Sequence, residues 1–379
     1  MSTPFDPATP FDPATSFDPA TPRPEDAHYL HEHYRSRNAP SPALGLFYPI
    51  KPALPWSAQM AIRRSLARRQ ARRAFPAWPI EPLLVRSRAE ALARELFSLG
   101  TARLRTINPW PQGHRFAVIL THDVEGPLGM KRMPALLDLE RRHGFVSSWN
   151  FVAEAYRVTE ADLATVRGAG GEIGLHGITH DGRLFRDRTS FEASLRKIRS
   201  YLESWQAVGF RSPSTLRNAA WMHELPCLYD SSFPDTDPFQ PQPGGCCWIF
   251  PFFFGDVVEL PITLDQDHTL FVLLRERSIE RWTQKSRWII EHSGLINVLV
   301  HPDYMDAQRL ALYERFLEFL SEQEGGWHAL PREVAQWWRK RAALCAQLNS
   351  SNDELPGEVI GEATLAWAHA EEGRVVYDV

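Results

Sequence analysis

The stretch FAVILTHDVEGP, residues 116 to 127, joins an apolar run to an acidic end. Its first part, Phe116 to Leu120, predicts a buried β-strand, because a short continuous apolar run fits a strand covered on both faces. Asp123 and Glu125 lie two residues apart near the end of this strand, so they share a face. Two carboxylates placed in this way could meet one metal ion. From the spacing alone, either acid could reach that ion.

A second polar cluster is HGITH, residues 176 to 180, which follows the strand-like stretch 172–175. Its two imidazoles can converge if the segment after the strand turns helically. Two neutral imidazoles and one carboxylate are typical of a hydrolytic metal site that leaves a position for water. The pair alone is a weak signal, because 14 His in 379 residues give about 0.5 pairs at any fixed spacing by chance.

The order of the predicted elements strengthens the signal. Strands are predicted at 116–120, 146–152, 172–175, 208–213, 227–233, 257–264 and 295–300, and helices at 131–143, 159–167, 190–205, 278–292 and 307–323. Polar clusters follow several of these strands at the carboxyl end, which is where α/β barrels carry their chemistry. The alternation therefore predicts an α/β barrel with one site at that end.

Four motifs in this order resemble those of a known family. They are Thr121 to Glu125, His176 with His180, Arg211-Ser212-Pro213, and Leu299-Val300-His301. Together they resemble the polysaccharide deacetylase family, carbohydrate esterase family 4, over about residues 115–305. The resemblance implies a distorted (β/α)7-type barrel and metal-dependent N-deacetylation, with Zn²⁺ as the expected divalent ion. The usual family motif has adjacent aspartates, whereas Val124 separates the two acids here.

Each motif residue receives a predicted role. Asp123 is the predicted general base, because a carboxylate beside metal-bound water can accept its proton. The predicted metal ligands are Glu125, His176 and His180. The resemblance implies that Arg211 orients the base, and a nearby guanidinium would keep that carboxylate ionised. It also implies that His301 is the general acid, which protonates the amine leaving group.

Aromatic side chains suggest how a sugar could bind. Trp149, Trp221 and Tyr229 are predicted to contact substrate, and Asp230 belongs to a segment that resembles the family's sugar-binding part. The run from Trp248 to Phe254 is more typical of core, because consecutive apolar residues are usually buried.

The sequence divides into five predicted parts: a disordered repeat tail (1–27), an N-terminal helical and irregular extension (28–114), the barrel (115–305), C-terminal helices (306–348) and an acidic tail (349–379). The tail repeats Phe-Asp-Pro-Ala-Thr three times, and such proline-rich sequence disfavours helix and sheet. Because no signal-peptide pattern and no long apolar stretch are found, a cytoplasmic location is expected. Four cysteines with one adjacent pair also fit a reducing compartment.

The net charge indicates whether nucleic acid or a membrane surface is an expected partner. A net charge of −4 and a pI near 6.4 give no general attraction to nucleic acid or to an anionic membrane. The basic segment 63–73 allows weak contact with a membrane surface, but an amphipathic helix packed on the barrel through Met60, Ile62 and Leu66 is the favoured interpretation. The sequence does not indicate an oligomeric state.

Three functions remain open. The first is removal of an N-acetyl group from an amino sugar or glycan precursor, for which the partner is an N-acetylated sugar. The second is hydrolysis of a non-sugar amide or cyclic imide by a related barrel. The third is a catalytically silent glycan-binding or scaffold protein. The full set of acids, histidines and arginine argues against the third function.

Overall fold

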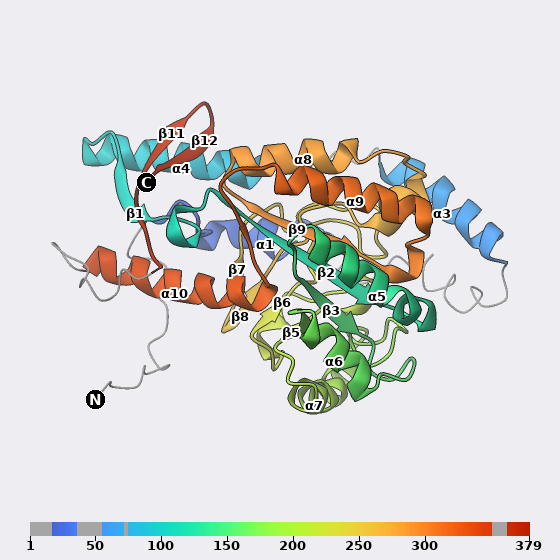
Figure 1. The fold of residues 1–379 in the computed structure, drawn as a ribbon. Helices are drawn as coiled ribbons and strands as arrows, with labels where there is room; N and C mark the ends of the chain where they lie inside the picture. The colour runs from blue at the N-terminus through green and yellow to red at the C-terminus, as the bar shows by residue number, and fades with distance from the viewer. Residues whose placement is uncertain (1–16, 36–54, 72–74, 351–361) are drawn as a thin grey trace.

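The computed structural model describes residues 17–35, 55–71, 75–350 and 362–379 (Figure 1). The first two tail repeats, residues 72 and 73 of the basic segment, and residues 351–361 of the predicted acidic tail lie outside these ranges.

The main sheet curls into a distorted barrel, as predicted. Its parallel strands run in the order β9, β2, β3, β4, β5, β6 and β8, and β7 pairs antiparallel with β8 at the end. The strands are β2 (Phe116–Val124), β3 (Ser147–Phe151), β4 (Glu172–Leu175), β5 (Gly209–Phe210), β6 (Tyr229–Asp230), β7 (Phe252–Phe254), β8 (Val257–Glu259) and β9 (Leu295–Val300). A further strand, β10 (Gly326–His328), pairs parallel with the start of β2.

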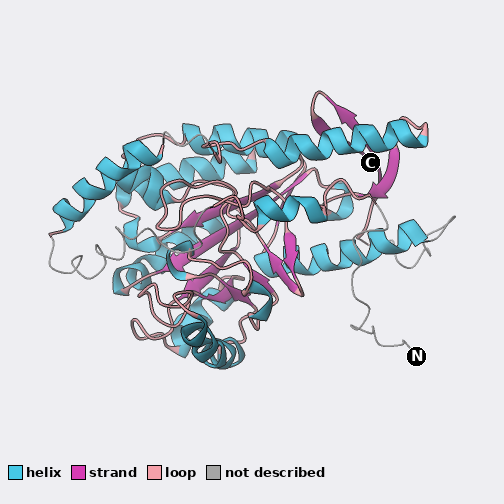
Figure 2. Ribbon diagram, turned by 180° about the vertical axis from the view of Figure 1, so that it is seen from behind, coloured by secondary structure: helices cyan, strands magenta, loops and turns pink. Residues whose placement is uncertain are grey.

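Helices lie outside the sheet (Figure 2). Those of the barrel are α5 (Pro127–Arg142), α6 (Glu160–Gly168), α7 (Arg188–Ser204) and α8 (Glu280–Glu291), followed by α9 (Ala307–Ser321) and α10 (Pro331–Ser350). Each predicted helix of the barrel is present, with ends shifted by a few residues. Such shifts are expected because capping decides where a helix begins.

Side-chain hydrogen bonds of Asn297 and Thr263, instead of a continuous strand ladder, join β9 to the stretch after β8. Asn297 of β9 donates its side-chain amide to the carbonyl oxygens of Leu260 (3.1 Å) and Pro261 (3.0 Å), and its backbone oxygen accepts from the amide of Leu264 at 3.3 Å. A fully buried amide that finds several partners holds its neighbours in place. The predicted strand 257–264 is therefore regular only in β8, and its second half meets β9 through these bonds.

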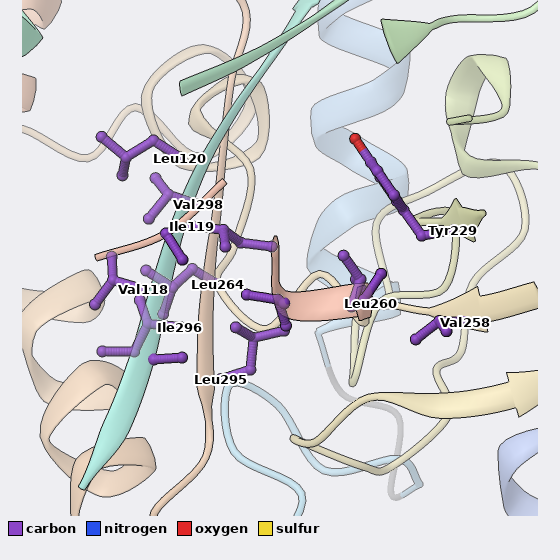
Figure 3. Packing of buried hydrophobic residues seen from close by; sticks show 14 of the residues in the cluster. Val118, Ile119, Leu120, Tyr229, Val258, Leu260, Leu264, Leu295, Ile296 and Val298 are labelled. Carbon is purple, nitrogen blue, oxygen red and sulfur yellow. The ribbon is translucent and has the colours of Figure 1, made fainter. Parts of the chain in front are cut away.

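The core lies inside the sheet and between the sheet and its helices. Val118 and Leu120 of β2 belong to one buried cluster with Ile296 and Val298 of β9 (Figure 3). All nine residues of β2 are buried, which agrees with the continuous apolar run from which the strand was predicted. This strand, paired with β9 and β3 along most of its length, brings Asp123 to the carboxyl end of the barrel.

The N-terminal extension packs on the barrel. It includes α1 (Ala27–Leu30), α3 (Trp56–Gln70) and α4 (Leu83–Leu99). Arg64 of α3 donates to the carbonyl oxygen of Val272 at 3.1 Å, and Arg63 lies 3.4 Å from a ring nitrogen of His268. The described start of the predicted basic segment thus contacts residues 268–274 of the barrel. The predicted packing through Ile62 is wrong, because this residue is 42 % exposed, and the side chains of Met60 and Leu66 lie outside the described part of the structure. The prediction of membrane-surface contact stays a prediction.

Part of the predicted disordered tail is ordered. The third repeat packs against α10, where both carboxylate oxygens of Asp18 pair with Arg341 at 2.5 and 2.8 Å. Arg88 of α4 lies over the Phe17 ring at 4.7 Å and donates to the backbone oxygen of Asp18. The expectation of disorder up to residue 27 is therefore wrong for residues 17–27, because a buried ion pair and a cation–π contact hold them.

The end of the chain also forms structure that was not predicted. β11 (Leu365–Glu371) and β12 (Arg374–Asp378) form a hairpin that pairs with β1 (Leu104–Ile107) in a separate three-stranded sheet. The acidic composition of 349–379 hid the alternation in 365–378, where Ala366 and Ala368 face inward against α4. The expected tail is thus wrong for these residues.

Two further findings concern the whole described chain. No helix within the described ranges has the length and apolar character needed to cross a membrane. The thiols of Cys227, Cys246, Cys247 and Cys345 are all free, which agrees with the expectation that they form no disulfide framework.

Candidate metal centre

Asp123 is buried at the end of β2 and held by two donors. Asn150, its register partner on β3, donates to Oδ1 at 2.9 Å, and Arg211 donates to the same oxygen at 3.2 Å. The other oxygen, Oδ2, lies 3.7 Å from Nδ1 of His176. The carboxylate is therefore fixed through Oδ1, while Oδ2 has no donor among the described residues.

Arg211 follows β5 and is itself fully fixed. Its guanidinium donates to the backbone oxygen and the hydroxyl of Ser231, both at 2.7 Å, and to Thr121 Oγ1 at 2.8 Å. With 1 % of its side chain exposed, it is a rigid buried cation beside Asp123. This is the place that the sequence predicted for it.

The two histidines converge without a helical turn. His176 and His180 follow β4 in an irregular loop, yet their ring centroids lie 5.4 Å apart. Gly177 bends this loop at φ +71°, where a side chain would also collide with Pro213. The expected helical turn is thus wrong, and the left-handed glycine provides the bend instead.

The tautomer of His176 leaves one nitrogen available. Its Nδ1 lies 3.1 Å from the backbone oxygen of Arg211, so Nδ1 carries the proton and donates. Nε2 of the same ring is buried and has no hydrogen-bond partner among the described residues. An unpartnered ring nitrogen with the opposite nitrogen bonded to a carbonyl is the usual arrangement of a metal-binding histidine.

Glu125 lies in the turn between β2 and α5 and faces both histidines. Its Oε1 is 3.0 Å from Nε2 of His180, and one ligand atom from each of Glu125, His176 and His180 lies within 4.8 Å of the others. Side-chain exposure is 24 % for Glu125 and 27 % for His180 but 2 % for His176. Solvent therefore reaches this group from the side of Glu125 and His180.

His301 follows β9 and faces Glu125 from the opposite side. Its Nδ1 pairs with Oδ1 of Asp267 at 2.6 Å, and its Nε2 lies 3.9 Å from Oε1 of Glu125. The buried Asp267 also accepts from the His301 backbone amide at 3.1 Å. These bonds orient Nε2 toward the candidate centre.

Burial and mutual charge set the protonation of the site. Burial would raise the pKa of Asp123, but His176, which is charged only at the low pH where Asp123 titrates, and the cations Arg211 and His301 outweigh burial and lower that pKa. Burial lowers the pKa of His176 to about 4, so this ring is neutral at pH 7. For His301 burial also favours the neutral form, yet the charge and hydrogen bond of Asp267 raise its pKa to about 10. A carboxylate, a neutral imidazole and an imidazolium thus coexist within one site.

The residues fit a divalent ion. The group provides a carboxylate oxygen and two imidazole nitrogens within a single ligand sphere, which is the donor set of open zinc sites. The unpartnered buried Nε2 of His176 has no other explanation among the described residues. These donors suit a divalent ion that accepts both nitrogen and oxygen ligands.

The predicted substrate residues do not come together. Trp149 is fully buried and its ring packs 4.2 Å from that of His122, and Tyr229 donates to Glu172 at 2.7 Å inside the core. Asp230 is fully buried and accepts from the hydroxyl of Ser232 at 2.8 Å. None of these three has a surface that a sugar could contact, because each lies on or beside a strand of the core.

Trp221 is the partly buried member of the predicted substrate set. It packs 5.3 Å from Phe191 of α7, with the guanidinium of Arg188 5.7 Å from its ring. These contacts are on the outer helical layer, and no contact joins Trp221 to the candidate metal ligands among the described residues.

Two partners of the site were missed. Asn150 could have been found, because it is a polar residue near the end of the strand next to Asp123. Asp267 has no comparable signal, since it lies 34 residues before His301 in an irregular stretch. His122, expected to pack on the other face, does so, with its ring nitrogens near Glu140 (2.6 Å) and the backbone oxygen of Val300 (3.2 Å).

Comparisons with known proteins bear on the fold. No protein-family model matches the sequence, and no curated protein matches it. Among solved structures, an allantoinase named Puue is similar with a TM-score of 0.50 and 18 % identity over 61 % of this chain and 93 % of that one.

Two similar structures have names that refer to polysaccharide deacetylase. One from Mycobacterium smegmatis has a TM-score of 0.49 and 20 % identity, covering 65 % of this chain and 97 % of the other. One from Pseudomonas aeruginosa PAO1 has the same score and identity, with 62 % and 94 % covered. At such identities the likeness concerns the fold alone. The chain therefore has the predicted distorted α/β barrel, and its fold is similar to that of the Puue allantoinase.

Proposed function

We propose that the protein is a metal-dependent hydrolase that removes an N-acetyl group from an amino sugar or glycan precursor. The observation that carries this proposal is the convergence of Glu125, His176 and His180 within 4.8 Å beside a buried, ionised Asp123. The names of the similar structures support a deacetylase-type hydrolase.

Each residue of the site has a separate role in the proposed amide hydrolysis. Glu125, His176 and His180 would hold a divalent ion, which would supply Lewis-acid chemistry for the attack of water on the amide. Asp123 accepts a proton at Oδ2, because Oδ1 is occupied by Asn150 and Arg211. Arg211 keeps that carboxylate ionised before the transfer. His301 is positively charged at neutral pH, so it can donate a proton from Nε2 to the departing amine.

The first test compares purified wild type with Asp123→Asn and His176→Ala. Metal content is measured by elemental analysis, and amine and acetate release are measured with N-acetylhexosamine substrates. We expect stoichiometric metal in wild type and in Asp123→Asn, with activity reduced by on the order of 100-fold or more in the latter because the base is lost. His176→Ala should lose both metal and activity, and Tyr201→Phe, at a half-buried tyrosine of α7, serves as the control.

A second candidate function is hydrolysis of a non-sugar amide or cyclic imide. One similar structure is named an allantoinase, and this observation supports the second candidate. The same preparations decide between the two: metal-loaded wild type that leaves acetylated sugars intact but hydrolyses cyclic imides favours the second candidate. A wild type that binds no divalent metal contradicts both and favours a silent barrel.

A further inference from the structure

The turn after β9 contacts Glu125 at two points. This turn comprises His301 and the 3₁₀ segment Pro302–Tyr304. Asp303 Oδ2 accepts the backbone amide of Glu125 at 2.9 Å, and the Tyr304 hydroxyl donates to Glu125 Oε2 at 3.2 Å. One segment of four residues therefore holds both the backbone and the side chain of the candidate metal ligand.

Asp303 also joins this turn to the start of α5. Its Oδ1 accepts the amide of Gly129 at 3.0 Å, within the first turn of that helix. A side chain at position 129 would place Cβ 2.2 Å from Asp303 Oδ2, so the close approach requires glycine. A carboxylate that accepts two backbone amides at a helix start has a fixed position.

Glu125 needs such support because the sheet does not provide it. The parallel ladder of β2 ends at Val124, which pairs with Phe151, so Glu125 lies outside the strand. Fixing a long glutamate side chain has a cost in conformational entropy. A hydrogen bond that orders the side chain before the ion arrives removes part of this cost from metal binding.

The Tyr304 ring is itself supported by the N-terminal extension. Its centroid lies 4.9 Å from that of His268, whose Nε2 is 3.4 Å from Arg63 of α3. The ring also lies 5.7 Å from His301. Tyr304 is thus enclosed by aromatic neighbours on two sides while its hydroxyl meets Glu125.

We propose that Asp303 and Tyr304 are positioning residues that hold Glu125 in its metal-binding conformation. Tyr304 occupies Oε2, which leaves Oε1, the oxygen facing His180 and His301, for the ion. The inference rests on the proposed function, because it takes Glu125 as a metal ligand. Since the turn begins at His301, it also joins the metal ligand to the predicted proton donor.

The test measures the dissociation constant for Zn²⁺ by competition with a chromophoric chelator, with no substrate present. Tyr304→Phe should bind Zn²⁺ roughly 10-fold to 100-fold more weakly than wild type, the usual effect of losing a partner of a metal ligand. Tyr201→Phe is the matched control, because it removes a hydroxyl 3.5 Å from Glu154 on an exposed face. We expect it to bind Zn²⁺ as wild type does.

A second variant and a second readout make the test decisive. Asp303→Asn keeps the size of the side chain but loses one of two acceptor oxygens, so it should also weaken Zn²⁺ binding. If circular dichroism shows that Tyr304→Phe does not fold, Asp303→Asn takes its place in the test. Co²⁺-loaded Tyr304→Phe should show an altered d–d absorption spectrum. An unchanged dissociation constant and spectrum in folded Tyr304→Phe would overturn the inference.

Glu125→Gln separates this inference from the proposed function. If Glu125→Gln weakens Zn²⁺ binding and Tyr304→Phe does not, the positioning role is wrong and the metal site stands. If Glu125→Gln also binds Zn²⁺ as wild type does, Glu125 is not a ligand, and both the inference and the proposed metal site fail.

Discussion

At the scale of single residues, the candidate site depends on which oxygen of Asp123 is occupied. Asn150 and Arg211 both donate to Oδ1, so proton transfer is directed to Oδ2. The acids and histidines could be predicted because each ends a strand in a recognisable order. Asp267 could not be predicted, because it lies outside the strands and 34 residues before His301, so only the folded chain brings the two together.

The position of Asn150 depends on Gly174 of β4. A Cβ at position 174 would lie 1.9 Å from Asn150 Oδ1, so Gly174→Ala must displace the amide that holds Asp123. We expect amide hydrolysis to fall by on the order of 100-fold, the usual cost of a misplaced catalytic group, with Zn²⁺ still bound. Steady-state kinetics and a Zn²⁺ titration check this prediction. Gly168→Ala, at an exposed position with nothing within 4 Å, should leave the activity unchanged.

At the scale of elements, local signals predicted helices better than short strands. The helix predicted over 159–167 is present as α6, and Thr159 and Asp162 form a full capping box at its start. In contrast, β5 and β6 are only two residues long, because their neighbours are held by side-chain bonds such as those of Arg211 and Ser231. Such bonds follow no periodic pattern in the sequence. The hairpin of β11 and β12 was missed for a different reason, because charged residues obscured the alternation of its strands.

The capping box of α6 allows a direct measurement. Thr159 Oγ1 accepts the amide of Asp162 at 3.3 Å, and Asp162 accepts the Thr159 amide at 2.8 Å. Thr159→Ala should therefore lower the free energy of unfolding by about 1 kcal/mol. Urea denaturation followed by circular dichroism measures this change. Thr165→Ala, on the exposed face of the same helix, should change the free energy by less, and an equal loss in both variants would contradict a specific cap.

At the scale of the whole molecule, α10 joins the third N-terminal repeat to β1, the strand that pairs with the C-terminal hairpin. Arg341 pairs with Asp18 from the third N-terminal repeat and donates to the backbone oxygen of Ile107 at 2.8 Å, at the end of β1. β1 in turn pairs with the C-terminal hairpin. Composition predicted neither contact, because proline-rich and acidic segments are normally solvated and only a buried partner far along the chain orders them.

Asp18→Asn tests whether this junction stabilises the fold. Burial would raise the pKa of Asp18, but Arg341 outweighs burial through charge and hydrogen bonds and lowers the pKa to about 2. Asp18→Asn leaves Arg341 buried without a counter-charge, so we expect a loss of about 3–5 kcal/mol in the free energy of unfolding at pH 7. Denaturant titrations of both proteins measure this loss, and exposed Asp138→Asn should cost far less because water screens its ion pairs.

The pH dependence gives the same junction an independent check. A carboxyl group with a lowered folded-state pKa contributes stability above its unfolded pKa, near 4, and loses it as the pH falls toward the folded value. Since that value is about 2 for Asp18, the difference between wild type and Asp18→Asn should be constant from pH 7 to pH 5 and shrink below pH 4. A difference that stays constant down to the lowest pH at which both proteins fold would show that the ion pair is not its source.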